Sequence, residues 1–317
     1  MRLDSIKQAE GIIEQPSPGR KWVTTILKTA VSVGLLIFLF SKVDMVRVGE
    51  SFRHVHPGVF FLSALAYLVL QSVNIFRWLV MIRVLGYRQS FGRLSTFYFT
   101  GYFFNLFLPT SIGGDIGRCY YLAENPRDIP RAFTTILADR ASGMVALMCI
   151  GTFALLIGPE VRIPDSMAWV TMGGTAALLA GVVLPFLFPR FFRRFTVPFR
   201  YWEKPVSLGA ALILSFIIQL SIVGVNILIG LSLGVDIPSL YYFVFVPLVT
   251  IAGMIPISLN GLGVREGAYV YFLTQAGVSD ADSLVFGLIW LILVLIISGI
   301  GGGVWVVTSR TQSSAKA

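Results

Sequence analysis

The chain has 317 residues, of which 56% are hydrophobic and only 13% are charged, and its mean hydropathy is +0.79. One soluble core cannot hide that much apolar surface, so the composition excludes an ordinary soluble protein and indicates an integral membrane protein. The formal net charge is +9, but the basic residues are spread among loops and are not gathered with aromatic residues. This pattern argues against nucleic acid as a partner.

The sequence predicts three regions in chain order. Residues 1–20 form a polar cytoplasmic segment that lacks the apolar core and cleavage site of a secretory signal. Residues 21–308 form a membrane domain, and residues 309–317 form a cytoplasmic tail. Six apolar runs in the domain are long enough to cross roughly 30 Å of hydrocarbon as helices. They lie near residues 22–41, 58–82, 132–157, 167–188, 207–231 and 284–307.

Two further apolar segments, 91–123 and 240–276, are interrupted by the same motif. Residues 109–118 and 256–265, 147 positions apart, both follow the pattern P-x-S-φ-x-G-x-x-x-R, where φ is apolar. Proline and glycine release backbone hydrogen bonds and an arginine is unfavourable in lipid, so the recurrence points to function. Each segment is too short for two full spans and a turn, which favours re-entrant or broken helices.

The loop charges decide whether each segment is a hairpin or a single span. If both are hairpins and both chain ends are cytoplasmic, the cytoplasmic side receives 16 basic loop residues and the other side 4, whereas two single spans give 10 and 10. The positive-inside rule therefore favours hairpins, with the N- and C-termini on the cytoplasmic side of the cell (inner) membrane. Three spans separate the hairpins, so the two enter from opposite sides.

These observations predict an all-α integral membrane protein with about six full transmembrane helices and two re-entrant or broken helical hairpins in an inverted repeat. Inverted repeats with discontinuous helices are typical of transporters, whose binding site lies near the bilayer midplane. The alternative is that two short helices merely fill a helical bundle.

The arginines that end the two motifs, Arg118 and Arg265, occupy equivalent positions in the hairpins. A guanidinium offers a planar fork of donors that suits phosphate, and the motif glycines let backbone N–H groups approach an anion at a half-helix N-terminus. The motifs therefore predict one phosphate-binding half-site in each leaflet. The other substrate-binding candidates in and beside the motifs are Ser111, Gly114, Asp115, Ser258, Gly261 and Glu266, and Asp139 and Arg140 of the span that begins near residue 132 complete the set.

Internal ion pairs are the alternative role for the motif arginines. Arg118 would then pair with Asp115 or Asp139, and Arg265 with its neighbour Glu266. The two interpretations are compatible, because a carboxylate can hold an arginine in place until a phosphate arrives.

Asp139 and Arg140 lie about 10 Å into the span that begins near residue 132. Neighbouring residues point about 100° apart on a helix, so these two serve different partners. We expect Asp139 to orient Arg118 or Arg140, with a purely structural ion pair as the alternative. Arg77 lies near a helix end and is expected to snorkel to the membrane interface.

Other polar and small residues in the spans give weaker signals. Asn105, Gln219 and Asn226 either line the same cavity or form hydrogen bonds between helices. The glycine-rich run 299–303 allows tight helix contact, either within the chain or in a homo-oligomer. The few cysteines and histidines match no metal-site pattern, so we expect no metal and no cofactor.

The residues around both motifs resemble the signatures of the lysylphosphatidylglycerol synthase transmembrane region, also called the flippase-like family. The matching stretches are residues 108–115, Arg118, Tyr120, residues 137–140 and residues 255–267. In bifunctional members, this region moves an aminoacylated phospholipid between leaflets, while a separate soluble domain charges the lipid from an aminoacyl-tRNA. We expect a standalone member without that synthase domain. Asn260 departs from the small residue, often glycine, expected at its position.

The motifs and the resemblance together predict a transporter of flippase type, not an enzyme. Its partner would be a phosphate-bearing lipid, such as a phospholipid, an aminoacyl-phospholipid or a polyprenyl phosphate, which it moves between leaflets. No GxxxxGK[ST] phosphate loop occurs in the sequence, so ATP is not expected to drive transport directly. One alternative is an intramembrane lipid-modifying enzyme with Asp115, Asp139 or Glu266 as its base. Another is a membrane partner of a separate soluble synthase or glycosyltransferase.

Overall fold

The computed structural model describes residues 18–107, 113–158, 163–255 and 257–314, and every regular element in these ranges is helical. The elements are α2 (Pro18–Lys42), α3 (Met45–His54), α4 (Pro57–Val84), α5 (Phe91–Phe107), α6 (Gly113–Leu122), the 3₁₀ turn η1 (Pro126–Asp128), α7 (Ile129–Ile157), α8 (Asp165–Leu187), α9 (Pro189–Phe192), α10 (Thr196–Phe199), α11 (Pro205–Leu233), α12 (Ser239–Met254), α13 (Val264–Gln275) and α14 (Asp280–Ser314). The predicted all-α class is confirmed.

The long helices match the predicted spans. Among the described residues, α4, α7, α8, α11 and α14 are each long and apolar enough to cross a membrane. They coincide with the last five predicted apolar runs. The first run forms α2, which meets α3 at a bend of 90°, and this pair supplies a sixth span when its two helices are taken together. The chain is therefore a multi-pass membrane protein.

The helices repeat as well as the motifs. A shift of 147 positions carries α4, α5, α6 and α7 onto α11, α12, α13 and α14 in the same order, with bounds that agree to within a few residues for most of them. The long helices α4 and α11, which open the two repeats, pack against each other along their length. Proline at the first helical position of each needs no backbone N–H donor there, which suits a helix start.

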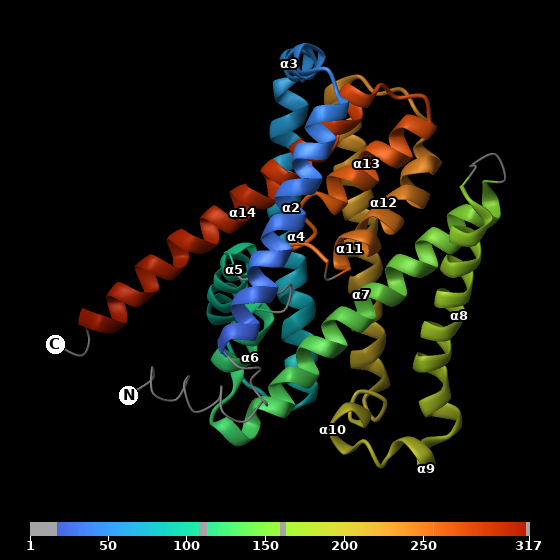
Figure 1. The fold of residues 1–317 in the computed structure, drawn as a ribbon. Coiled ribbons are helices and arrows are strands. Elements are labelled where there is room, and N and C mark those ends of the chain that lie inside the picture. Colours follow the sequence, from blue (N-terminus) through green and yellow to red (C-terminus); the bar gives the residue numbers. More distant parts are fainter. Residues whose placement is uncertain (1–17, 108–112, 159–162, 256, 315–317) are drawn as a thin grey trace.

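The two hairpins open toward opposite ends of the bundle (Figure 1). The open end of α5 and α6 lies at the end where α4 finishes and α7 begins, whereas the open end of α12 and α13 lies where α11 finishes and α14 begins. The inner ends of α5 and α6 and those of α12 and α13 therefore both lie toward the middle of the bundle. This is the inverted arrangement that the loop charges predict.

The glycine-rich run near the end of α14 makes an internal contact. A Cβ added at Gly301 would overlap the carbonyl of Phe99, and one at Gly302 would lie 2.8 Å from the Phe103 ring. The absence of side chains thus lets α14 pack closely on α5. Of the two roles predicted for this run, contact within the chain is the one that the structure shows.

Candidate functional site

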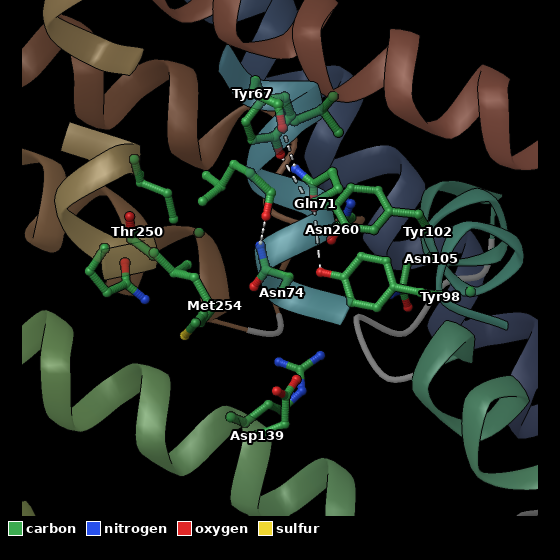
Figure 2. A pocket seen from close by; sticks show the side chains of 18 of the residues that line it. Tyr67, Gln71, Asn74, Tyr98, Tyr102, Asn105, Asp139, Thr250, Met254 and Asn260 are labelled. Atoms are coloured by element: carbon green, nitrogen blue, oxygen red, sulfur yellow. Dashed lines mark hydrogen bonds between the residues drawn. The ribbon is translucent and has the colours of Figure 1, made fainter. Parts of the chain in front are cut away.

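A polar cavity of about 310 Å³ lies where the two hairpins meet. Arg118 reaches it from α6 and Arg265 from α13, so the structure brings the two motif arginines into one site. Asp115, Asp139 and Arg140 also line it. Figure 2 shows tyrosine and amide side chains converging on the cavity from α4 and α5, with Asn260 of the second hairpin close to them. Five of the ten predicted site residues thus share one cavity.

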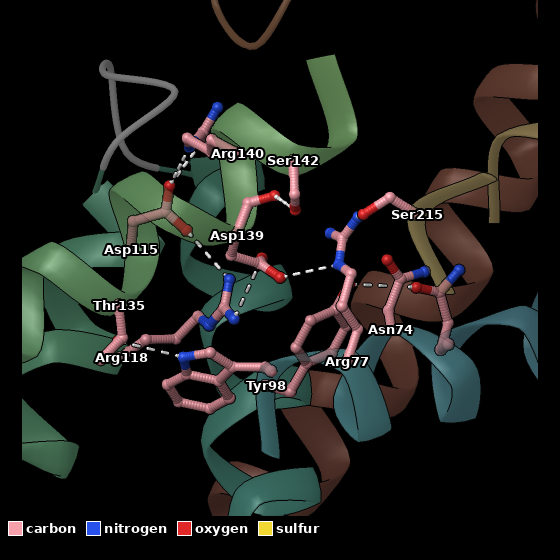
Figure 3. A network of polar contacts seen from close by, with 12 residues as sticks. Asn74, Arg77, Tyr98, Asp115, Arg118, Thr135, Asp139, Arg140, Ser142 and Ser215 are labelled. Atoms are coloured by element: carbon pink, nitrogen blue, oxygen red, sulfur yellow. Dashed lines mark hydrogen bonds and ion pairs between the residues drawn. The ribbon is translucent and has the colours of Figure 1, made fainter. Parts of the chain in front are cut away.

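The first hairpin contributes to a cluster of charged residues on one side of the cavity (Figure 3). Asp139 of α7 accepts a 2.9 Å hydrogen bond from Nε of Arg77 and lies 3.6 Å from Nη2 of Arg118. Asp115 of α6 lies 3.4 Å from Nη1 of Arg118 and accepts a 2.6 Å hydrogen bond from Nε of Arg140. These five residues, hereafter the arginine–aspartate cluster, alternate in charge and join α4, α6 and α7.

Arg118 is buried in the middle of this cluster, with 7% of its surface exposed. Its guanidinium lies 4.1 Å from the ring centre of Trp78 and 4.8 Å from that of Tyr98, which fixes the plane of the fork by cation–π contact. Nε and Nη2 are buried without a hydrogen-bond partner among the described residues. The two aspartates and the two rings hold Arg118 in place. A buried donor without an acceptor is costly, so the two unpaired nitrogens leave Arg118 with capacity for another anion.

Arg265 is held differently. It forms no ion pair with any described carboxylate, and the predicted pairing with Glu266 is wrong. Glu266 is buried and accepts a 2.6 Å hydrogen bond from the backbone N–H of Gly263, so it caps the start of α13. The side chain of Arg265 lies against Gly253 of α12, where an added Cβ would sit 3.0 Å from its Nε. Arg265 therefore lines the cavity as a cation without a carboxylate partner among the described residues.

The motif glycines bring the two arms of each hairpin together. A Cβ at Gly114 would overlap the carbonyl oxygen of Gly101 on α5, and a Cβ at Gly261 would lie 2.7 Å from the carbonyl oxygen of Gly253 on α12. The backbone N–H of Gly114 donates to Asn105 at 2.8 Å, so it is not directed at a ligand as predicted. Neither motif glycine is among the described lining residues of the cavity, and their role in the structure is close packing.

The tip of the second hairpin is fixed by backbone conformation and by α2. Asn260 has φ +48°, a left-handed conformation that asparagine tolerates better than most residues and that glycine adopts freely. The backbone N–H of Leu259 donates to the hydroxyl of Ser32 on α2 at 2.8 Å. Ser258 is buried without a hydrogen-bond partner among the described residues and does not line the cavity. Its counterpart Ser111 lies outside the described residues.

The charge balance of the cavity favours an anion. Among the described lining residues, four arginines face two aspartates, which leaves an excess of two positive charges. Both aspartates are already paired with arginine. The described residues include no group of three or more His, Cys, Asp or Glu side chains arranged to hold a metal ion. The site is suited to an anion with several oxygen acceptors, such as a phosphate.

Comparison with known proteins places this arrangement in a family. The family model described as the lysylphosphatidylglycerol synthase TM region matches residues 25–302, which is most of the chain. The chain belongs to this family. A search of curated proteins returned no match. Membership supports a membrane function related to lipids.

The sequence-based prediction for this member of the synthase TM region family left out one main residue of the site. Arg77 is 6% exposed and paired with Asp139, so the prediction that it snorkels to the interface is wrong. Tyr67, Gln71 and Asn74 lie on the same side of α4 and line the cavity with it. Their spacing of four and three residues marks a polar stripe on an otherwise apolar helix, and this signal was present in the sequence.

The other predicted partners can now be placed. Asp139 pairs with Arg77 and Arg118, while Arg140 pairs with Asp115, so the expectation that Asp139 and Arg140 serve different partners is confirmed. Gln219 and Asn105 line the cavity. Asn226 does not, because its amide oxygen accepts a 2.7 Å hydrogen bond from Tyr269.

Proposed function

We propose that the protein is a lipid transporter of flippase type that moves a phosphate-bearing lipid between the two leaflets. The observation that supports this most directly is the cavity at the meeting point of two oppositely directed hairpins. It has an excess of two positive charges, and two nitrogens of Arg118, Nε and Nη2, have no hydrogen-bond acceptor among the described residues. Discontinuous helices that meet at a charged site inside the membrane are a common architecture for transport.

In this proposal the phosphate lies between Arg118 and Arg265. Arg265 has no carboxylate partner among the described residues, so its charge is available to a phosphate without the loss of an ion pair. Arg118 interacts with Asp115 and Asp139 at 3.4 and 3.6 Å, longer than an ideal charged hydrogen bond, so a phosphate can compete for its remaining donors. When the phosphate leaves, the two aspartates compensate the charge of Arg118 again. The aspartates thus favour release as well as stability.

The same contacts support transport over chemistry on the lipid. Asp115 and Asp139 each bind two arginines, and Glu266 caps a helix, so each predicted general base is engaged in structural contacts. We propose that the protein is not an enzyme, that it resides in the cell (inner) membrane, and that both termini are cytoplasmic.

The test is reconstitution in liposomes with a fluorescent anionic phospholipid. Dithionite destroys the label in the outer leaflet, so transport makes more than the outer-leaflet share accessible. Wild type is expected to expose the inner pool, whereas Arg118→Gln and Arg265→Gln are expected to slow this by about tenfold or more, the loss of a charged hydrogen bond. Arg47→Gln is the matched control, because Arg47 is exposed on α3 and does not line the cavity. Wild type that behaves like protein-free liposomes across several anionic lipids would refute the proposal.

A further inference from the structure

The polar cavity has its open side between α7 and α12. Of its described lining residues, Arg140 on α7 and Met254 on α12 are the two with exposed side chains, at 41% and 42%. Figure 2 shows Thr250 and Met254 on the part of α12 that borders the cavity. A lipid headgroup in the cavity would therefore have its tails leave between these two helices.

A second, apolar groove is bordered by the same helices. It has a volume of about 610 Å³ and is lined by α7, α11 and the start of α12. Leu220 of α11 lies in the groove, while its neighbour Gln219 lines the polar cavity, so two adjacent faces of one helix border the two spaces. Phe153 and Ile157 of α7 are more than half exposed, so the groove opens at the lipid-facing surface.

Helix periodicity places residues of the cavity and residues of the groove on one face of α7. On α7, the groove residues Ile150, Phe153 and Ile157 follow Asp139 by 11, 14 and 18 positions, spacings that return to the same face of a helix with 3.6 residues per turn.

The same rule holds on α12. The groove residues Phe243 and Leu240 precede Met254 by 11 and 14 positions, so they share its face. Each helix therefore borders the cavity and the groove with the same face. Eleven residues of helix span about 16 Å, a distance that a long hydrocarbon chain can cover.

We propose that this groove, hereafter the tail groove, receives one hydrocarbon chain of the lipid whose phosphate lies between Arg118 and Arg265. The inference rests on the proposed function and adds a second binding element to it. The lining of apolar side chains matches an acyl or prenyl chain, and van der Waals packing is the interaction that would hold such a chain within a membrane. Because α12 starts beside the groove, the hydrocarbon chain of the lipid extends toward the end of the bundle where the second hairpin opens.

The test is photo-crosslinking in liposomes with phosphatidic acid that carries a diazirine in one acyl chain, followed by peptide mapping. Labels are expected on residues 149–157 of α7 and 240–243 of α12. Arg118→Gln is expected to reduce this labelling by about tenfold, because a chain anchored by its headgroup depends on Arg118 and bulk lipid does not. Equal labelling in wild type and Arg118→Gln, or labelling elsewhere, would overturn the inference.

A substitution inside the groove provides a second measurement that does not depend on the arginine cluster. Leu220→Trp fills the groove at a position that is 47% exposed, and Ile213→Trp is the control at a 63% exposed position on the same helix outside the groove. The first variant is expected to lose the groove labels and the second to keep them. If neither variant changes the labels while transport still depends on Arg118, the tail groove is refuted and the proposed function stands.

Discussion

In the first hairpin Arg118 is bordered by Asp115 and Asp139, whereas Arg265 in the second hairpin has no carboxylate partner among the described residues. The 147-residue shift that relates the two arginines places Leu262 at the position of Asp115 and Phe286 at that of Asp139. Phe286 is fully buried in an aromatic cluster with Phe245 and Tyr269.

The difference shows that an inverted repeat can keep its backbone plan and its arginine while the counter-ions occur on one side alone. Ion pairs hold the first hairpin in place, whereas aromatic packing, helix capping and contact with α2 hold the second. The two half-sites of the cavity are therefore unequal. Substitutions that remove a charge should therefore destabilise the two hairpins by different amounts, whereas those that disturb packing should destabilise both.

The largest effect is expected from Asp139→Asn, which leaves Arg77 and Arg118 without their shared anion. Breaking a buried ion pair on one side costs about 3–5 kcal/mol, so the unfolding temperature in detergent should fall steeply. Added anionic phospholipid should restore more stability to this variant than to wild type, because a phosphate can replace the lost charge. Phe286→Leu at the equivalent position is the comparison, and its response to anionic lipid should match that of wild type.

Gly261→Ala is expected to be the next most damaging change. Gly261 has φ +80° and its added Cβ would lie 2.7 Å from the carbonyl oxygen of Gly253, so backbone strain and overpacking together should destabilise the protein by about 2–4 kcal/mol. Gly114→Ala in the first hairpin adds overlap with Gly101 without the positive φ.

The matched control for both glycine variants is Gly117→Ala, where an added Cβ meets nothing within 4 Å. Alanine at this position should maintain or slightly raise stability. Equal unfolding temperatures for Gly114→Ala and Gly117→Ala would show that α5 and α6 pack less closely than the structure indicates.

Arg118→Gln and Arg265→Gln should differ in stability although both are expected to impair phosphate binding. Arg118→Gln removes contacts to two aspartates and two aromatic rings, so a loss of about 1–3 kcal/mol is expected. Arg265→Gln removes no ion pair to a described carboxylate, and its stability should stay within about 1 kcal/mol of wild type. Thermal unfolding and phosphate binding measured on the same samples check both values, and a larger loss for Arg265→Gln would contradict the comparison.

The smallest effect is expected from Ser32→Ala, which removes the hydrogen bond between α2 and the backbone N–H of Leu259. The loss should be about 1 kcal/mol. Hydrogen exchange should increase in residues 257–263 and stay unchanged in α6, because the contact reaches the second hairpin alone. Increased exchange in both hairpins would indicate that their tips move together.

Much of the fold followed from local patterns. Apolar runs of the length of a bilayer located α4, α7, α8, α11 and α14, and the interrupted segments located both hairpins to within one or two residues at their outer ends. Helix length and hydropathy are determined by neighbouring residues, so the sequence carries them directly. The count of loop charges also predicted the opposite directions of the hairpins, because charge near span ends controls orientation.

The partners of the buried charges were predicted only in part. Arg77 and Asp139 are 62 positions apart, and their pairing depends on how α4 and α7 rotate and cross, which local periodicity does not specify. Glu266 shows the same limit at short range, because its carboxylate faces Gly263 and not the adjacent Arg265. Each partner was chosen by packing geometry.

The sequence by itself determined the membrane class, the inverted hairpins and the two motif arginines, since these depend on composition, span length and loop charge. The tertiary structure alone decided that both arginines share one cavity, that Arg77 belongs to it and that its two halves are unequal. The physical reason is that hydrophobic burial places helices in a membrane, whereas contacts between distant side chains determine which charges meet.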